Sequence, residues 1–216
     1  ILNDINKTND IKGPINLKFP HIISDGIKSL FSSFDKARDK FQYKKSFNAV
    51  FPLKVNQFAS FVEEFKELSL KYNYGLEAGS KAELIIAMNY INKNCPIIVN
   101  GFKDKEMIKL CFLSHKINKQ TSIIIEDLRE IKYIIELSKE IPKSIPYIGI
   151  RVKLHTLGIG IWKESTGIDS KFGLTSIELL EAISLLKEKN LIQFFKILHF
   201  HIGSQLEDIK TLNKAI

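Results

Sequence analysis

Four segments of the sequence carry side chains that could do chemistry at the ends of strands. Lys54 ends the apolar run in FPLKVNQ, where partial desolvation would make its amine a nucleophile or a Schiff-base former. Glu77 ends a short run in GLEAGSKAEL, Arg151 lies in GIRVK, and the last segment is HFHIGSQ. Each residue alone also has an ordinary structural explanation, such as a lysine that extends to solvent, so one residue decides little.

The last segment places His199 and His201 two residues apart, on the same face of the strand that we expect there. Such a pair could ligate a metal, but no third ligand is evident nearby, and we predict no metal site. The histidines could instead belong to the core, or one imidazole could stack against an aromatic cofactor ring. Arg151 is a costly buried charge within its strand unless an anion or an acidic group meets it.

Short apolar runs and segments of helical period alternate along the chain from residue 47 onward. We expect strands at residues 47–54, around Leu76, and at 96–100, 121–126, 146–153 and 194–202. We expect helices at residues 58–72, 81–91, 105–115, 128–139 and 176–189, and a further one at the C-terminal end. Ser80 is the expected N-cap of the second helix. The long loop within residues 149–175 contains the single tryptophan, Trp162, and such loops usually bind something.

Strands separated by helices in this way must run parallel, because each crossover returns the chain to the same edge. An open doubly wound sheet and a (β/α)8 barrel both fit, but the first strand-helix junction lacks the glycine-rich dinucleotide fingerprint. We therefore predict an α/β fold, a TIM-like (β/α)8 barrel that is incomplete, with about six β/α units in residues 47–216. Residues 1–46 form a predicted N-terminal extension with a helix at 24–43 that Ser24 caps.

The composition excludes several classes of protein. With 44% hydrophobic and 26% charged residues among 216, the chain is neither disordered nor fibrous. The basic residues behind the net charge of +8 include only three arginines and are scattered among acidic ones, so we predict no nucleic-acid partner. No apolar run reaches the roughly 20 residues that span a bilayer, and two cysteines make no disulfide framework. We expect a cytoplasmic protein without a membrane partner.

Six motifs occur in the order FPLKVNQ, GLEAGSKAEL, IIVNGFKD, GIRVK, SKFGL and LHFHIGSQ. In this order they resemble the biosynthetic arginine decarboxylases, which are pyridoxal-phosphate enzymes of the alanine-racemase-like barrel class. The resemblance extends from about Phe19 to the last residue. It implies a barrel followed by a C-terminal β-domain that this sequence lacks. The family's glycine-rich phosphate loop, pyridine-facing glutamate and catalytic cysteine would also follow residue 216.

The resemblance implies roles for five residues. Lys54 matches the lysine that binds pyridoxal phosphate covalently, and His201 matches the imidazole that stacks on the cofactor ring. Ser204 matches a residue that reaches the cofactor phosphate. Glu77 and Arg151 match, on class-wide grounds, barrel positions near the ring and its 3′-oxygen. Lys54 and His201 are thus the expected catalytic residues, and all five are expected to bind the cofactor.

The reaction that the resemblance implies is decarboxylation of L-arginine to agmatine and CO2, a step of polyamine and spermidine biosynthesis. Another decarboxylase of the class, acting on diaminopimelate or ornithine, and a non-catalytic pyridoxal-phosphate barrel protein remain open as alternatives. The family implies a homo-oligomer for the full-length protein, and some members need magnesium. The sequence starts without Met and stops inside an apparent helix, so we expect a fragment that is inactive alone and prone to aggregate.

Overall fold

The structure, a computed structural model, describes residues 13–14, 17–154, 171–203 and 210. Contacts along the chain divide it into two compact units, Ile1–Lys44 and Lys45–Ile216. This division falls two residues before the boundary that we predict after residue 46. The assignment of the two parts as domains stays a prediction.

In the first unit, the described residues include one long helix, α2 (Pro20–Lys40). The helix begins four residues earlier than predicted, so Ser24 lies within it and the predicted cap is wrong. Pro20 explains the earlier start, because proline has its φ preset for a helix and lacks an N–H that the first turn would leave unpaired. Arg38 and Lys40 lie in the last turn, where positive charge is favourable.

The second unit is built on six parallel strands. They are β1 (Val50–Pro52), β2 (Gly75–Ala78), β3 (Pro96–Val99), β4 (Gln120–Ile125), β5 (Tyr147–Arg151) and β6 (Phe195–His199). Each strand pairs in parallel with the next one along the chain, so the spatial order equals the sequence order. A doubly wound sheet reverses its order part-way, whereas a (β/α) barrel does not. The order identifies a partial (β/α)8 barrel and confirms the predicted fold class.

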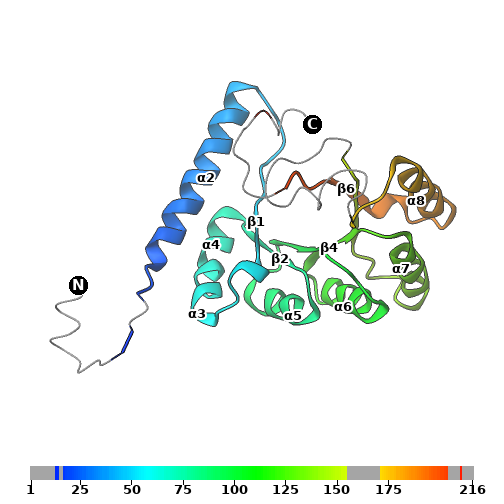
Figure 1. Cartoon of the computed structure of the whole chain (residues 1–216), viewed down its shortest axis with the longest axis horizontal. Helices are drawn as coiled ribbons and strands as arrows, with labels where there is room; N and C mark the ends of the chain where they lie inside the picture. The colour runs from blue at the N-terminus through cyan, green and yellow to red at the C-terminus, as the bar shows by residue number, and fades with distance from the viewer. Residues whose placement is uncertain (1–12, 15–16, 155–170, 204–209, 211–216) are drawn as a thin grey trace. The chain divides into compact units, whose positions relative to one another are not determined.

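Helices follow the first five strands and cover one face of the sheet (Figure 1). They are α3 (Ala59–Val62), α4 (Glu64–Tyr72), α5 (Lys81–Tyr90), α6 (Lys105–Lys116), α7 (Leu128–Glu140) and α8 (Ser176–Glu188). The predicted helix at 58–72 is interrupted at Glu63, and the bounds of the next four agree with prediction within one residue. The helix predicted at the C-terminal end lies outside the described residues.

Side-chain caps fix where four of these helices begin. Ser80, Asp104, Asp127 and Thr175 each accept a hydrogen bond from a backbone N–H of the first turn. Ser80 accepts from the N–H of Glu83 at 3.2 Å, as predicted. The caps matter for function because they hold the loops that follow β2, β3 and β4, where a barrel builds its sites.

Four strands, β1, β3, β5 and β6, are shorter than predicted, and the differences at β1 and β6 move a candidate residue. β1 ends at Pro52, and the next three residues form a short 3₁₀ turn, Leu53–Val55, that contains Lys54. The prediction that Lys54 ends the strand is therefore wrong, and the reason is that Pro52 has no N–H to continue a ladder. β6 ends at His199, so His201 lies two residues beyond the strand. The expectation that both histidines share a strand face is wrong.

The two faces of the sheet have different roles. The Thr121 hydroxyl on β4 hydrogen-bonds Ser114 of α6, with the oxygens 2.7 Å apart, so Thr121, Ile123 and Ile125 face the helices. Ile123 and Ile125 are completely buried in the core between sheet and helices. The alternate residues form what we call the inner face. Toward the carboxyl ends of the strands, the register places on this face Pro52, Glu77, Ile98, Ser122, Ile124, Gly149, Arg151, Ile197 and His199.

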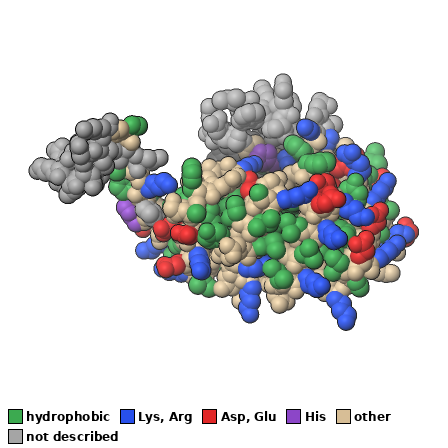
Figure 2. All heavy atoms as spheres, turned by 90° about the horizontal axis from the view of Figure 1, so that it is seen from below, with side chains coloured by type: hydrophobic (Ala, Val, Ile, Leu, Met, Phe, Trp, Pro, Cys, Tyr) green, Lys and Arg blue, Asp and Glu red, His purple; other side chains and the backbone are tan. Residues whose placement is uncertain are grey.

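The surface mixes charges of both signs. On the face that Figure 2 shows, basic and acidic side chains are interspersed, with apolar side chains between them. None of the helices in the described ranges is both long and apolar enough to cross a membrane.

Candidate functional site

Lys54 lies directly after the carboxyl end of β1, and its side chain is exposed. Its neighbour Leu53 is completely buried and anchors the turn in the core. The Lys54 amine has no hydrogen bond or ion pair with any residue that the structure describes. An unpaired amine at the carboxyl end of a parallel barrel is available to a ligand, because βα loops at this end build the sites of such folds.

A buried carboxylate connects the segment after Lys54 to the next strand. Glu83 of α5 accepts a hydrogen bond from Gln57 Nε2 at 2.8 Å and another from the N–H of Gly79 at 2.6 Å. Gln57 follows the turn of Lys54, and Gly79 follows β2, which carries Glu77 on the inner face. Glu83 therefore stabilises the two loops against each other where the candidate residues lie.

Three polar side chains lie together at the carboxyl end of the inner face, and we call them the inner-face cluster: Glu126, Arg151 and His199. Arg151 Nη1 donates to Glu126 Oε1 at 2.7 Å, and the two side chains are 14% and 3% exposed. His199 of β6 is the register partner of Arg151 on β5. The sequence predicts that an anion or an acidic group must meet Arg151, and Glu126 is that group.

Burial and neighbouring charges set the protonation of both histidines. Burial, followed by the positive charge of Arg151, lowers the pKa of His199 from 6.5 to about 4. Partial burial, Arg151 and Lys54, in that order, lower the pKa of His201 as well. The positive charge of Lys54 contributes to this lowering, although Lys54 follows β1 and His201 follows β6. Both imidazoles are therefore neutral at neutral pH.

Several buried polar atoms at this end lack partners. Glu126 Oε2, His199 Nδ1 and Asn100 Oδ1 make no hydrogen bond within the described part of the chain. Asn100 directly follows β3, two residues beyond Ile98 of the inner face. Buried polar atoms are normally paired in folded proteins. Unpaired atoms after three strands at one end of the barrel indicate a place for a polar ligand.

Four of the five predicted site residues lie at the carboxyl ends of strands or just beyond them: Lys54, Glu77, Arg151 and His201. Ser204 and most of the predicted binding loop, residues 155–170, lie outside the described residues. The roles of all five stay predictions. Sequence reasoning missed Glu126, although it ends the apolar run TSIII just as Glu77 ends its own run. It also missed Glu83 and Asn100, for which the spacing along the chain offers no comparable signal.

Comparison with known proteins assigns the chain to a family. Residues 27–216 match the sequence profile described as "Pyridoxal-dependent decarboxylase, pyridoxal binding domain". The chain belongs to this family. Lys54, the inner-face cluster and His201 all lie within the part of the chain that matches this pyridoxal-binding domain.

Individual relatives of this decarboxylase domain carry a more specific name. The biosynthetic arginine decarboxylase of Prochlorococcus marinus (strain AS9601) is 42% identical over 211 residues, which are 97% of this chain and 32% of that protein. The biosynthetic arginine decarboxylase of Bacteroides thetaiotaomicron is 41% identical over 209 residues, 96% of this chain and 33% of that protein. The chain thus spans about a third of the length of these relatives.

Solved structures agree with these similarities. The crystal structure of the biosynthetic arginine decarboxylase from Campylobacter jejuni is 46% identical with a TM-score of 0.89, and the match covers 99% of this chain and 34% of that one. Alanine racemase from Acinetobacter baumannii has a TM-score of 0.55 at 13% identity, covering 87% of this chain and 46% of that one. The second likeness concerns the fold alone, and it agrees with the barrel that the strand order identifies.

The described residues of the decarboxylase domain fit pyridoxal phosphate, which presents an aldehyde, an aromatic ring and charged or polar substituents. Lys54 offers an amine without a partner among the described residues, and the neutral imidazole of His201 offers a flat ring. Arg151 offers N–H donors, and the unpaired atoms of Asn100 and His199 offer places for polar substituents. This donor set suits an anionic aromatic aldehyde.

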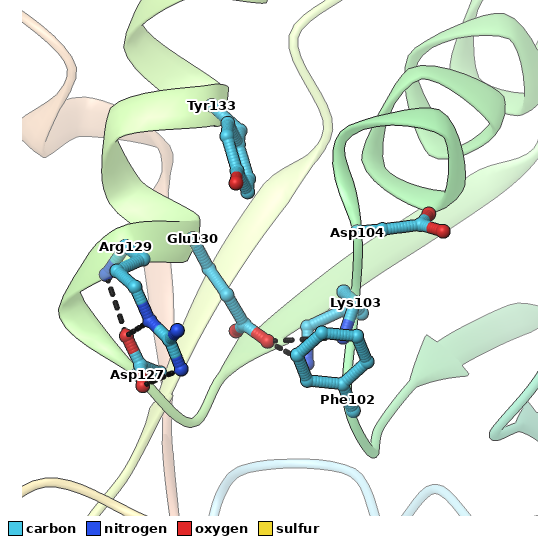
Figure 3. Close-up of a pocket in the computed structure, with 7 residues that line it drawn as sticks. All are labelled: Phe102, Lys103, Asp104, Asp127, Arg129, Glu130 and Tyr133. Carbon is cyan, nitrogen blue, oxygen red and sulfur yellow. Dashed lines mark hydrogen bonds and ion pairs between the residues drawn. The ribbon is translucent and has the colours of Figure 1, made fainter.

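A small cavity of the domain lies between the loops after β3 and β4 (Figure 3). Its lining residues are Phe102, Lys103, Asp104, Asp127, Arg129, Glu130 and Tyr133. The cavity measures about 60 Å³, whereas an engineered cavity that binds benzene measures roughly 150 Å³. It is therefore too small for a pyridoxal ring. No group of three or more His, Cys, Asp or Glu in the described ranges is arranged to hold a metal ion.

Proposed function

We propose that the full-length protein that carries this chain decarboxylates L-arginine to agmatine and CO2, with pyridoxal phosphate as its cofactor. The similarity to proteins named biosynthetic arginine decarboxylase supports the substrate. One observation carries the proposal for the site. Lys54 and His201 follow the first and last described strands of one parallel sheet, so both lie at its carboxyl end, and the charge of Lys54 contributes to the lowered pKa of His201. An amine and a neutral flat ring are thus both at the carboxyl ends of the strands.

Each of the five predicted site residues has a distinct role in this proposal. Lys54 binds the cofactor covalently through Nζ, and His201 presents the face of its imidazole. Ser204 contacts the phosphate, while Glu77 and Arg151 contact the ring and its 3′-oxygen. When bound, pyridoxal phosphate supplies an electron sink for the charge that remains when CO2 leaves. A proton takes the place of the carboxylate at the α-carbon of the substrate.

The charges of the site residues are consistent with these proposed roles. Glu126 is paired with Arg151, so this guanidinium adds less positive charge to the site than an unpaired one would. His201 is held neutral by its partial burial and by Arg151 and Lys54, so it can stack without adding a cation beside the lysine. Lys54 keeps the unpaired amine that covalent binding requires.

Covalent trapping tests the cofactor part of the proposal. Pyridoxal phosphate is added to the full-length protein, the adduct is reduced with borohydride, and peptide mass spectrometry locates the pyridoxyl group. We expect the group on Lys54, and we expect Lys54→Ala to abolish it. Lys116→Ala is the matched control, because Lys116 is an exposed lysine in the last turn of α6 and should leave labelling unchanged. Labelling that is unchanged in Lys54→Ala would contradict the assignment.

Carbon dioxide release tests the substrate. The full-length protein loaded with pyridoxal phosphate is given carboxyl-labelled L-arginine, L-ornithine or diaminopimelate at equal concentration. We expect release from arginine to exceed release from the other two. Turnover of ornithine or diaminopimelate without turnover of arginine would replace the proposed substrate by one of these.

The proposal includes a homo-oligomer in the cytoplasm, on the strength of the family resemblance. Light scattering of the purified full-length protein tests the oligomer, and a monomer would contradict it. The need for magnesium is tested by activity with and without a chelator. Activity that survives complete chelation would show that the protein does without the ion.

A further inference from the structure

The inner-face cluster contains a carboxylate to which the sequence motifs assign no role. The Glu126 side chain is 3% exposed. Its Oε1 accepts a hydrogen bond from Arg151 Nη1 at 2.7 Å, while its Oε2 is buried and unpaired within the described part of the chain. A buried carboxylate is costly unless a partner compensates its charge, and Arg151 is that partner. The contact of Glu126 with a site residue, Arg151, indicates that this carboxylate acts at the carboxyl end of the barrel.

We propose that Glu126 is a positioning residue for Arg151. It holds the guanidinium by Nη1 in one orientation, so that the remaining N–H groups meet the bound cofactor in a defined geometry. This inference rests on the proposed function, because it concerns the binding of pyridoxal phosphate. Glu126 itself acts through Arg151 and has no contact with the reacting atoms in this proposal.

The other contacts of Arg151 fix its backbone and stem but not the direction of its N–H groups. The ring of Phe172 lies 5.6 Å from Arg151 Cζ, which restricts the guanidinium to the face of that ring. The N–H of Leu174 donates to the Arg151 carbonyl at 2.8 Å and fixes the backbone. Gly173 passes so close that an added Cβ would lie 3.2 Å from Arg151 Cγ. These contacts fix the aliphatic stem of Arg151 and the plane of its guanidinium, and the hydrogen bond that Arg151 donates to Glu126 fixes the direction of the remaining N–H groups.

Glu126 is well suited to the task because its own backbone is anchored twice. Its N–H donates to Glu130 Oε2 at 2.9 Å, and its carbonyl accepts from the N–H of Gly173 at 3.3 Å. Glu130 is in turn held by the buried amine of Lys103, 3.1 Å from Oε1. The carboxylate is therefore presented from a rigid position, as a group that orients another side chain must be.

The binding of pyridoxal phosphate to the full-length protein tests the inference. The Kd is obtained by absorbance titration, and visible circular dichroism reports the orientation of the bound cofactor. We expect Glu126→Gln to raise the Kd about 10- to 100-fold, by analogy with the loss of a group that orients a metal-binding side chain. We also expect it to change the visible circular dichroism. Glu136→Gln is the control, because it removes an exposed ion pair with Lys105 and should leave both signals unchanged.

The dependence on Arg151 distinguishes positioning from a general structural effect. In an Arg151→Met background, Glu126→Gln should change the Kd by no more than about twofold, the scatter of independent sites. A similar rise in Kd with and without Arg151 would overturn the inference, and so would an unchanged Kd and dichroism in Glu126→Gln. Glu126→Asp serves where Glu126→Gln folds poorly. It keeps the charge but withdraws the carboxylate, so it should still raise the Kd, and a wild-type Kd would count against positioning.

Failure of the proposed function gives a different result. If the wild-type protein itself binds no pyridoxal phosphate, or if Lys54→Ala leaves the absorbance titration unchanged, the proposed function fails before any variant of Glu126 is compared. If wild-type binding depends on Lys54 and only the Glu126 variants behave like wild type, the positioning role alone is wrong.

Discussion

Replacing Glu130 with alanine would leave the amine of Lys103 buried without its carboxylate. Glu130 Oε1 lies 3.1 Å from Lys103 Nζ and accepts from the Lys103 N–H at 3.2 Å, while Oε2 accepts from the Glu126 N–H at 2.9 Å. The side chains of Lys103 and Glu130 are 0% and 4% exposed. After the change, the amine would keep its hydrogen bond to the Gly101 carbonyl. Breaking such a buried pair from one side costs about 3–5 kcal/mol, and we expect this loss in the free energy of unfolding.

An exposed ion pair between the first residue of α6 and α7 is a matched control. Lys105 Nζ lies 2.7 Å from Glu136 Oε2, and these side chains are 43% and 52% exposed. Both acidic residues lie on α7, so alanine changes helix propensity equally in the two variants. Water screens the exposed pair, and Glu136→Ala should cost at most about 1 kcal/mol.

Urea unfolding of the full-length protein, followed by circular dichroism, measures the difference from the midpoints at a common slope. The double variant Lys103→Met with Glu130→Leu should recover most of the loss, because replacing both partners of a buried pair by apolar groups is often neutral. Equal losses for Glu130→Ala and Glu136→Ala would refute the argument that burial makes this pair strong. The same conclusion would follow if the double variant were as unstable as Glu130→Ala.

Three further predictions concern stability. Gly75→Ala would place a Cβ 2.1 Å from the Pro96 carbonyl oxygen, so we expect a loss of at least about 3 kcal/mol in urea unfolding, the upper end of overpacking; a loss below 1 kcal/mol would contradict the geometry. Thr175→Ala removes the capping box that Thr175 forms with Glu178, and it should cost about 1 kcal/mol. Hydrogen bonds from Thr175 lower the pKa of Glu178. The contribution of this pair to the free energy of unfolding is therefore present above the ordinary pKa of a glutamate and is lost as the pH falls through the lowered pKa. An effect of Thr175→Ala that does not depend on pH would contradict this. The pKa of His199 is about 4 in the folded chain against 6.5 in the unfolded one, so the unfolded chain takes up a proton at a higher pH. The free energy of unfolding should therefore decrease as the pH falls from 6.5 to 4. Urea unfolding of His199→Gln should lack this part of the pH dependence, and an unchanged profile would refute it.

Much of the fold could be predicted from local sequence. All six predicted strands correspond to strands of the structure, and the capping residue Ser80 lies where the pattern predicts it. The misses have local physical causes. Pro20 starts α2 early, and Pro52 ends β1 before Lys54 because proline cannot donate to a ladder. The parallel pairing follows from the crossovers, and the consecutive strand order selects the barrel over the doubly wound sheet.

The candidate site was less accessible to the same reasoning. Lys54 and Arg151 were singled out by type and position, and the need of Arg151 for an acidic partner followed from the cost of a buried charge. That the partner is Glu126, 25 positions earlier in the chain, is a matter of the register between β4 and β5. Hydrogen bonds of Glu83 to Gln57 and Gly79 likewise join loops that no local pattern relates.

Residue types and their periods were enough to establish the kind of fold, the order of its elements and the chemistry that single side chains offer, because these depend on neighbours a few positions apart. Which side chains share one space depended on how the strands pair and which face the helices cover. Packing of the helices on one face leaves the other to Arg151 and His199, and the consecutive parallel order places Lys54 and His201 at the same end. Long-range pairing of this kind is a property of the folded chain, and it converts scattered polar residues into a candidate site.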